Sequence, residues 1–422
     1  MSLKIFLETV SSYVWGAFLL GLLLFTGLFY TFKLKLIQFR LIPFLFSCKG
    51  HKKSEKNGIS QFKTVCASLG TAMGTGNIVG VSTALLTGGA GSIFWMWVSA
   101  FLGMAVVYAE NYLSVQLRGS SDFSGPMLYI EKGLKSPVIA VIFSFFCIFA
   151  SLGMGGMVQA NSIENACSAC FITNKAAVAV IIFLTVSAVT VGGMKRIGAA
   201  AQLIIPFITA VYIFASVGVI FVYRHNLSSA FGEIFSQAFS LKSVGGGVGG
   251  YTMSQALSVG LRRGVFSNEA GLGSSPIMHG SAADSSPHNQ GMWSVFEVFL
   301  DTIICCTLTA LVLLTSNAES RNINIAFSAI FGDFSDVFIF ISITLFAFCT
   351  IIGWYYCGET AFRYITKKSD CRLYSVIFSA VTALGAAMTL ESVWAVSDIF
   401  NGLMAFPNLA AILLLSSHVK AE

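Results

Sequence analysis

One apolar run constrains this chain more than any other feature, because it is long enough to cross a bilayer and yet contains helix breakers. It extends from Thr64 to Leu86 without a charged side chain and holds four glycines, at positions 70, 74, 76 and 80. A glycine costs a helix about 1 kcal/mol relative to alanine, and freed backbone groups at membrane depth must face protein or a wet cavity. We therefore expect this helix to be interrupted near its middle. Its N–H and C=O groups could then hold an anionic group and a cation together.

Composition places the whole chain in a membrane. It is 55% hydrophobic and 10% charged, whereas a soluble protein has about 25% charged residues. Windows of about 19 residues give the candidate spans. Eleven spans are predicted, near 13–32, 64–86, 92–117, 138–163, 175–193, 198–223, 244–261, 291–315, 336–357, 373–390 and 394–416.

Basic residues give the orientation, because short cytoplasmic loops carry the excess of Lys and Arg. Placing the loop 33–63 inside puts most of the 25 basic residues on the cytoplasmic side, among them Arg262 and Arg263. The N terminus is then outside and the C terminus cytoplasmic. The net charge of +6 largely reflects this asymmetry, so it does not indicate a nucleic-acid surface.

The spans divide into an accessory part and two equal halves. Residues 1–63 form an N-terminal helix and a basic loop, 64–223 and 244–416 form two five-helix repeats, and 417–422 form a cytoplasmic tail. An odd number of spans per half inverts the second half relative to the first. Each half opens with a glycine-rich span, and paired interrupted segments are typical of a transporter site. For the glycines at 245–250, close helix packing is an equally good explanation.

Several motifs resemble those of a known family. They are Gly70–Val81, Gly88–Trp97, Gly103–Met104, Ala109–Glu110, Gly260–Pro276, Phe296–Thr302 and Gly353–Glu359. In this order, the motifs resemble those of the alanine or glycine:cation symporters, the AGCS family. The resemblance implies an all-α polytopic membrane protein of the amino acid, polyamine and organocation superfamily. It also implies a five-plus-five core of the leucine-transporter type, with broken first and sixth core helices.

A finer resemblance concerns the first core helix, where the run from Gly70 to Asn77 aligns without gaps with that of the bacterial leucine transporter. It implies that the amides of Thr75 and Gly76 receive the substrate carboxylate, with Asn77 also in the substrate site. It implies that the carbonyls of Gly70 and Met73 point at a sodium ion.

The eighth core helix completes the expected cation site. A carbonyl at Ala347 and a hydroxyl at Thr350 lie about one turn apart on one face, and a hard cation prefers oxygen ligands. The neighbours Cys349 and Ile351 supply no second hydroxyl. This departure keeps a proton open as the alternative to Na+.

Two further polar residues are candidates for the substrate site. Gln159 is an amide in an apolar span, where it needs a partner; the partner is either the polar end of a substrate or another helix. Gly153, Gly155 and Gly156 precede it and would admit a small ligand or a neighbouring backbone. Ser258, in the second glycine-rich span, is also assigned to the substrate site.

Intramembrane carboxylates are functional candidates by default. Glu110 and Glu359 lie toward predicted cytoplasmic ends, where loop arginines could pair with them. Glu297 and Asp301 share a helical face, and Asp301 is our candidate for cation coupling or for contact with a substrate amino group. A polar segment at the expected inner ends of spans suggests an inner gate or a fixed ion-pair network, formed by Arg262, Arg263, Asn268 and Glu269.

A membrane enzyme is the rival class, and it would need a titratable His at membrane depth for acid and base work. The histidines all fall in predicted loops or the tail: His51, His225, His279, His288 and His418. We therefore expect no enzyme, no cofactor and no nucleic-acid partner. The resemblance favours import of alanine, glycine or serine, in L or D form, with Na+ or H+, across the cell membrane of a bacterium. A transporter-like sensor or channel remains a third possibility.

Overall fold

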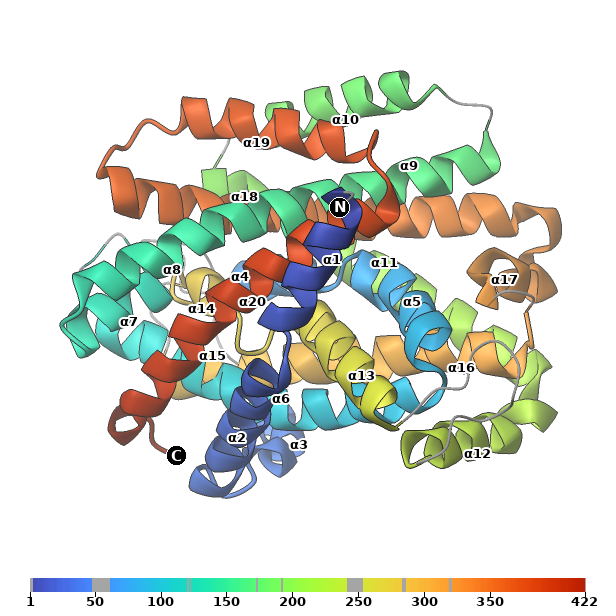
Figure 1. Cartoon of the computed structure of the whole chain (residues 1–422), viewed down its shortest axis with the longest axis horizontal. Helices are drawn as coiled ribbons and strands as arrows, with labels where there is room; N and C mark the ends of the chain where they lie inside the picture. Colours follow the sequence, from blue (N-terminus) through green and yellow to red (C-terminus); the bar gives the residue numbers. More distant parts are fainter. Residues whose placement is uncertain are drawn as a thin grey trace.

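The structure is a computed structural model, and every element of its described part is helical (Figure 1). It describes residues 3–47, 61–119, 121, 123–171, 174–190, 193–240, 253–282, 286–318 and 321–421. The first half contains α1 Leu3–Val14, α2 Ala17–Lys33, α3 Leu41–Ser47, α4 Gln61–Ala72, α5 Val79–Gly88, α6 Gly91–Arg118, α7 Pro126–Gly133, α8 Pro137–Ala150, α9 Val158–Cys170, α10 Lys175–Thr190, α11 Gly193–Val222 and α12 Leu227–Ala238. The second half contains α13 Met253–Asn268, α14 Ser275–His279, α15 Pro287–Val298, α16 Thr307–Thr315, α17 Ile323–Phe331, α18 Ser335–Thr366, α19 Arg372–Gly385 and α20 Leu390–Leu414.

Seven helical stretches of the described residues are long and apolar enough to cross a membrane. Shorter apolar helices occupy three other predicted positions, as α5, α10 and α19. Around the predicted span 244–261 the described helix is α13, which begins only at Met253. The glycines at 245–250 lie outside the described residues. A multi-pass helical membrane protein is therefore confirmed, whereas the count of eleven spans stays a prediction.

The helices pack around two long helices, α6 and α18. The α6 helix contacts α13 and α15, and α18 contacts α8, α9 and α11. At one edge of Figure 1, α10 and α19 lie against each other, and α2 packs on α6 toward the opposite edge. The two broken helices, α4–α5 and α13–α14, are enclosed between these parts.

The N-terminal helices attach to the last long helix. The chain bends between α1 and α2, where the Trp15 indole Nε1 donates to the carbonyl of Asp398 at 2.7 Å. One end of α2 is fixed by the Tyr30 hydroxyl, which donates to the carbonyl of Ile412 at 2.5 Å. Two contacts on α20 therefore hold this accessory element.

Two long helices contain π-helical turns, at Ser151–Met157 between α8 and α9, and at Phe299–Cys306 between α15 and α16. Such turns are rare and occur frequently at functional sites, because they free backbone groups and re-aim side chains. Here Gln159 lies two residues after the end of the first turn, and Asp301 lies within the second. Both side chains reach the first broken helix.

Candidate functional site at the first helix break

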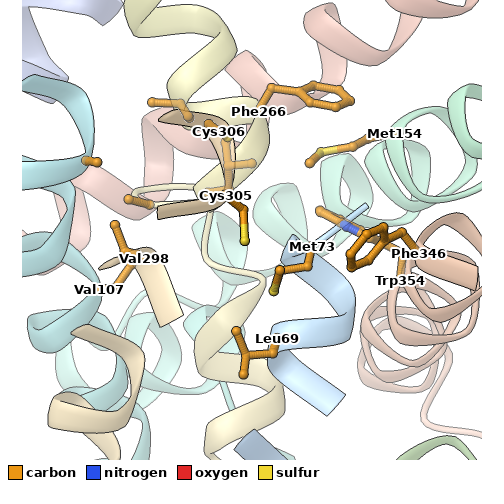
Figure 2. Close-up of a cluster of buried hydrophobic side chains, with 14 of the residues drawn as sticks. Leu69, Met73, Val107, Met154, Phe266, Val298, Cys305, Cys306, Phe346 and Trp354 are labelled. Atoms are coloured by element: carbon orange, nitrogen blue, oxygen red, sulfur yellow. The ribbon is translucent and has the colours of Figure 1, made fainter. Parts of the chain in front are cut away.

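The predicted interruption of the first core helix is present. The α4 helix ends at Ala72, a short 3-10 turn covers Thr75–Asn77, and α5 begins at Val79. Gly74 separates the pieces with φ −114° and ψ −147°. Figure 2 shows Met73 at this point, with Leu69 below it, Cys305 on one side and Met154 and Trp354 on the other. The break is therefore enclosed by protein.

The first freed amide is satisfied by another helix. The backbone N–H of Thr75 donates to Gln159 Oε1 at 3.1 Å, and Gln159 Nε2 donates to the carbonyl of Met154 at 3.1 Å. Of the two partners expected for Gln159, this structure shows the interhelical one. Gln159 Oε1 therefore accepts the hydrogen bond of Thr75 N–H that a substrate carboxylate oxygen could accept instead.

The expected cation ligands Gly70 and Thr350 meet on the other side of the break. Thr350 Oγ1 donates to the carbonyl of Gly70 at 2.9 Å. A Cβ on Gly74 would lie 2.5 Å from Thr350 Oγ1 and 3.0 Å from Gln159 Oε1. The hydroxyl, the carbonyl and the amide therefore converge where Gly74 leaves room. Met73 and Ala347, the other two expected cation ligands, are both 0% exposed.

Asp301 anchors the half of the helix beyond the break. Its carboxylate accepts hydrogen bonds from Asn77 Nδ2 at 2.7 Å, Ser267 Oγ at 2.8 Å and Thr302 Oγ1 at 2.7 Å. Asn77 Nδ2 also donates to the Asp301 carbonyl at 3.0 Å. Sequence reasoning missed Ser267 and Thr302, although each is next to a singled-out residue, Asn268 and Asp301 respectively.

Two polar atoms at this site have no hydrogen-bond partner within the described residues. They are Thr75 Oγ1 and Asn77 Oδ1, and both residues are at most 1% exposed. Asp301 is fully buried, and no Lys or Arg of the described ranges forms an ion pair with it. Buried polar groups without partners are rare. An acceptor without a donor beside an unpaired carboxylate suits a cation or an ammonium group.

A second break interrupts the helix that follows α12. Between α13 and α14 the chain has positive φ at Glu269 (+58°), Gly271 (+86°) and Gly273 (+87°). Glu269 accepts from Trp354 Nε1 at 2.8 Å and from the Ser274 hydroxyl. The break lies after the span 244–261 and is made by residues 269–274. The predicted inner-gate residue Glu269 is therefore a buried part of the break itself.

The structure does not bring Ser258 to the site. Ser258 lies within α13, nine residues before Ser267, which is about 14 Å along a helix. Its neighbour Val259 contacts Gly88 at the far end of α5. The α13 helix continues through Ser258 without a break, and Gly260 lies against the backbone carbonyl of Ser92.

The glycines before Gln159 also serve helix packing. A Cβ on Gly155 would lie 2.1 Å from the Cβ of Trp354, and a Cβ on Gly156 would lie 2.4 Å from Thr382 Oγ1. A Cβ on Gly153 would lie 3.2 Å from the Cα of Ser397. Of the two predicted uses, the structure shows the approach of neighbouring protein.

Two further sequence expectations are corrected. Glu110 is fully buried and accepts from Asn408 Nδ2, so it does not pair with a loop arginine. Arg262 and Arg263 lie within α13, which packs against α5, and both approach Asp398, at 3.7 and 3.5 Å. Glu269 accepts from Ser274 and Trp354 instead, so the predicted residues do not form one ion-pair network. The two arginines were expected at the inner end of the span 244–261, whereas α13 continues past them to Asn268.

The expectation that every histidine lies in a loop or the tail is wrong for His288, in the first turn of α15, and for the buried His279. His279 ends α14, is 0% exposed, and contacts Glu297 Oε1 through Nε2 at 2.9 Å and Gln290 Oε1 through Nδ1 at 2.5 Å. Ser68 Oγ donates to Glu297 Oε2 at 2.7 Å. Glu297 and Asp301 therefore serve different partners, since the π-turn separates their directions.

Comparison with known proteins identifies the family. A model of the sodium:alanine symporter family matches residues 1–422. The sodium/alanine symporter AgcS of Methanococcus maripaludis is 38% identical over 436 residues, covering 98% of this chain and 95% of that protein.

The chain belongs to the sodium:alanine symporter family. Another relative is the probable sodium/glutamine symporter GlnT of Bacillus subtilis, 34% identical over 419 residues, covering 96% of this chain and 87% of that protein. The crystal structure of MhsT in complex with L-phenylalanine matches with a TM-score of 0.61 at 14% identity, over 87% of this chain and all of that one. This structural likeness shows the fold alone. The family assignment makes the chain an amino-acid symporter of the membrane, as the motifs predicted.

Proposed function

We propose that this family member imports a small neutral amino acid, alanine or glycine, together with Na⁺ by alternating access. One observation carries the proposal. At the first break, the unpartnered Thr75 Oγ1 and Asn77 Oδ1 lie beside the unpaired carboxylate of Asp301, while Thr350 and Gly70 meet across the same break. A single interrupted helix thus offers partners for a zwitterion and for a cation.

The substrate carboxylate would bind at the start of the helical piece after Gly74. Thr75 and Gly76 begin this piece, and the free N–H groups of a helix start favour an anion. In the structure Gln159 Oε1 accepts from Thr75 N–H. The substrate oxygen would replace it there, and the Gln159 amide would then be free to contact the substrate.

The substrate amino group would face Asn77 and Asp301. An ammonium group donates hydrogen bonds, and Asn77 Oδ1 is an acceptor without a donor in the described part. The Asp301 carboxylate supplies the negative charge and is already oriented by three donors. A charge-assisted hydrogen bond is about twice as strong as a neutral one.

The residues around the break favour a small side chain. A Cβ on Gly76 would lie 3.3 Å from the Cα of Ser267 and 3.4 Å from the ring of Phe266. The Phe266 ring in turn lies 4.3 Å from that of Trp394. These aromatic groups close over the break, which supports alanine, glycine or serine and opposes a long side chain.

The cation would bind between the first break and α18. Its proposed ligands are the carbonyls of Gly70, Met73 and Ala347 and the hydroxyl of Thr350. The hydrogen bond from Thr350 to Gly70 already holds two of these oxygens 2.9 Å apart. Na⁺ is a hard cation and suits an oxygen site of this kind; coupling to H⁺ is the alternative.

The finer architecture belongs to the same proposal. We infer eleven spans, with an accessory part at 1–63, two inverted five-helix repeats at 64–223 and 244–416, and a tail at 417–422. The N terminus would be outside and the C terminus cytoplasmic, in the cell membrane of a bacterium. Rocking of one helix bundle against the other would expose the break to each side in turn.

Uptake into proteoliposomes tests the proposal. We expect an imposed Na⁺ gradient to drive accumulation of labelled alanine, and we expect alaninamide, which lacks the carboxylate, not to compete. If neither a Na⁺ nor a pH gradient drives uptake, a sensor or channel becomes the better description. Equal competition by alaninamide would remove the carboxylate site.

The cation site has its own test. Thr350→Val removes the hydroxyl, and Thr350→Ser keeps it while reducing bulk. We expect the valine variant to need at least about tenfold more Na⁺ for half-maximal uptake, because one lost oxygen ligand of about 1.4 kcal/mol gives that factor. The serine variant should stay near the parent. Unchanged Na⁺ dependence in Thr350→Val excludes the hydroxyl as a ligand.

A further inference from the structure

The helical core contains a histidine–carboxylate cluster that the proposed transport site does not use. His279 at the end of α14 contacts Glu297 and Gln290 on α15, and Glu297 also accepts from Ser68 on α4. His279 is 0% exposed and Glu297 is 4% exposed. The cluster therefore joins the short helix after the second break to the helix before the first break.

The hydrogen atoms of this cluster can be counted. With the Gln290 amide oriented as in this structure, Oε1 faces His279 Nδ1 at 2.5 Å and accepts a hydrogen bond only if Nδ1 carries a proton. The 2.9 Å contact between His279 Nε2 and Glu297 Oε1 requires a second proton between those atoms. A neutral imidazole carries only one N–H. In this amide orientation the cluster holds one proton more than a neutral histidine beside an ionised carboxylate, whereas with the amide turned over a neutral histidine satisfies both contacts.

Loss of that proton has a structural consequence. One of the two His279 contacts would lose its hydrogen, so it must break or the Gln290 amide must turn over. Gln290 Nε2 is buried and has no partner among the described residues, so it is available to donate to His279 Nδ1 after such a turn. The amide is thus placed to respond to the protonation state of the imidazole.

The other charged or titratable groups around the cluster either bind other partners or lie near Glu297 without a hydrogen bond to it. On α6, Arg118 donates to the carbonyls of Gly280 and Ala282, while His288 contacts Tyr108. On α18, Cys357 faces the carbonyl of Ser274. The groups close enough to feel the charge of Glu297 include Cys66 and Glu269. On α4, the Cβ of Lys63 faces Gly198 of α11. Among the described residues, His279 is the only basic group that forms an ion pair with Glu297.

We propose that His279 and Glu297 form a proton-binding site on the α4 side of the first break, filled in the closed arrangement and emptied when that side opens. The ligand is a proton, and the inference deepens the proposed transport function by adding a second coupled ion or a pH control. Ser68 lies two residues before Gly70, so movement of Glu297 is passed directly to the half-helix that forms the first break. A metal ion is a poorer occupant, because no group of three His, Cys, Asp or Glu ligands occurs in the described ranges.

Thermal unfolding of the purified full-length protein in detergent tests the proton site without requiring transport. A folded site that keeps a proton which the unfolded chain releases loses stability as pH rises above about 7. The expected change in the unfolding equilibrium is up to about tenfold per pH unit. The double variant His279→Gln with Glu297→Gln keeps hydrogen bonding without titration, and it should lose this part of the pH slope. The exposed His225→Gln is the matched control and should keep it.

Uptake into proteoliposomes is the second measurement. Lowering the internal pH from about 8 to about 6 should fill the site and slow Na⁺-driven alanine uptake several-fold in the parent and in His225→Gln. The double variant should show a flat profile. The same pH dependence in parent and double variant, in unfolding and in uptake, overturns the proton site. If the parent shows no uptake at any pH, the transport proposal fails, and the unfolding comparison still decides whether the site binds a proton.

Discussion

The two helix breaks differ in the residues that form them and in the origin of their hydrogen-bond partners. The first, between α4 and α5, is made by Gly74 with no carboxylate of its own, and its contacts come from Gln159, Thr350 and Asp301 on other helices. The second, between α13 and α14, contains its own carboxylate. Glu269 is held by Ser274 within the same segment and by Trp354 on α18.

This difference suggests that the first break binds a ligand, whereas the second holds neighbouring helices in place. At the first break, Thr75 Oγ1 and Asn77 Oδ1 have no partner in the described residues. At the second break, both oxygens of Glu269 accept hydrogen bonds, and the Gly271 carbonyl accepts from Asn408 Nδ2 at 2.9 Å. At the first break these two unpartnered oxygens lie on the interrupted helix itself, where they are available to a ligand. A break with satisfied groups instead fixes the geometry of its surroundings.

The largest effect is expected at Gly74. In Gly74→Ala the new Cβ would lie 2.5 Å from Thr350 Oγ1, so the hydroxyl must turn away from Gly70 or the break must widen. Overpacking of this kind costs about 1–3 kcal/mol, equivalent to a loss of roughly 5- to 150-fold in apparent affinity for Na⁺ and alanine. Uptake across a range of Na⁺ and alanine concentrations gives both affinities.

A matched control isolates this effect. Gly21 in α2 has no atom within 4 Å of an ideal Cβ, so Gly21→Ala should leave uptake unchanged. If Gly74→Ala also transports with parental affinities, the convergence of Thr350 and Gln159 on this point has no role in binding.

The second break should respond through stability. Trp354→Phe keeps a buried ring but removes the N–H that donates to Glu269 at 2.8 Å. We expect a loss of about 1–2 kcal/mol in unfolding free energy, the range for a buried hydrogen bond between helices in a membrane protein. Substrate and Na⁺ affinities should change less than twofold. Thermal unfolding in detergent, with uptake normalised to folded protein, measures both.

Trp394 provides the control for this substitution. Its indole N–H is buried but has no partner in the described part of the chain, and its ring stacks on Arg263 at 4.0 Å. Trp394→Phe retains a ring and loses no hydrogen bond, so its stability should match that of the parent. Equal destabilisation by both variants would attribute the loss at Trp354 to packing.

The sequence predicted the first break and its partners because all the signals were local. Four glycines in an apolar run predict an interrupted helix, and Thr350 was assigned to the cation site because its hydroxyl and the Ala347 carbonyl lie about one turn apart on the eighth core helix. Asp301 was found because a carboxylate in an apolar span is costly unless it has a function. In each case one residue or one short window carried the information.

The remainder depended on contacts between distant segments. The glycine-rich span before α13 suggested the second break, but glycine serves helix packing as readily as helix breaking, and the positive φ angles lie at 269–273. His279 was assigned to a loop because the helix containing it has only five residues. Its partner Glu297 is eighteen positions away, so neither the pair nor its burial could be recognised from local pattern.

The smallest effect distinguishes two serines of α13. Ser267→Ala removes one of three donors to Asp301, at 2.8 Å, and should raise the alanine concentration for half-maximal uptake about two- to tenfold, equivalent to roughly 0.5–1.5 kcal/mol. Ser258→Ala removes a partly exposed hydroxyl beside Val259, near the end of α5, and surface changes of this kind usually stay within about 0.5 kcal/mol. A larger effect at Ser258 than at Ser267 would indicate that the substrate contacts the glycine-rich span and would contradict the role of Asp301 in substrate binding. The reverse order assigns the substrate amino group to the first break alone, because only Ser267 is connected to it.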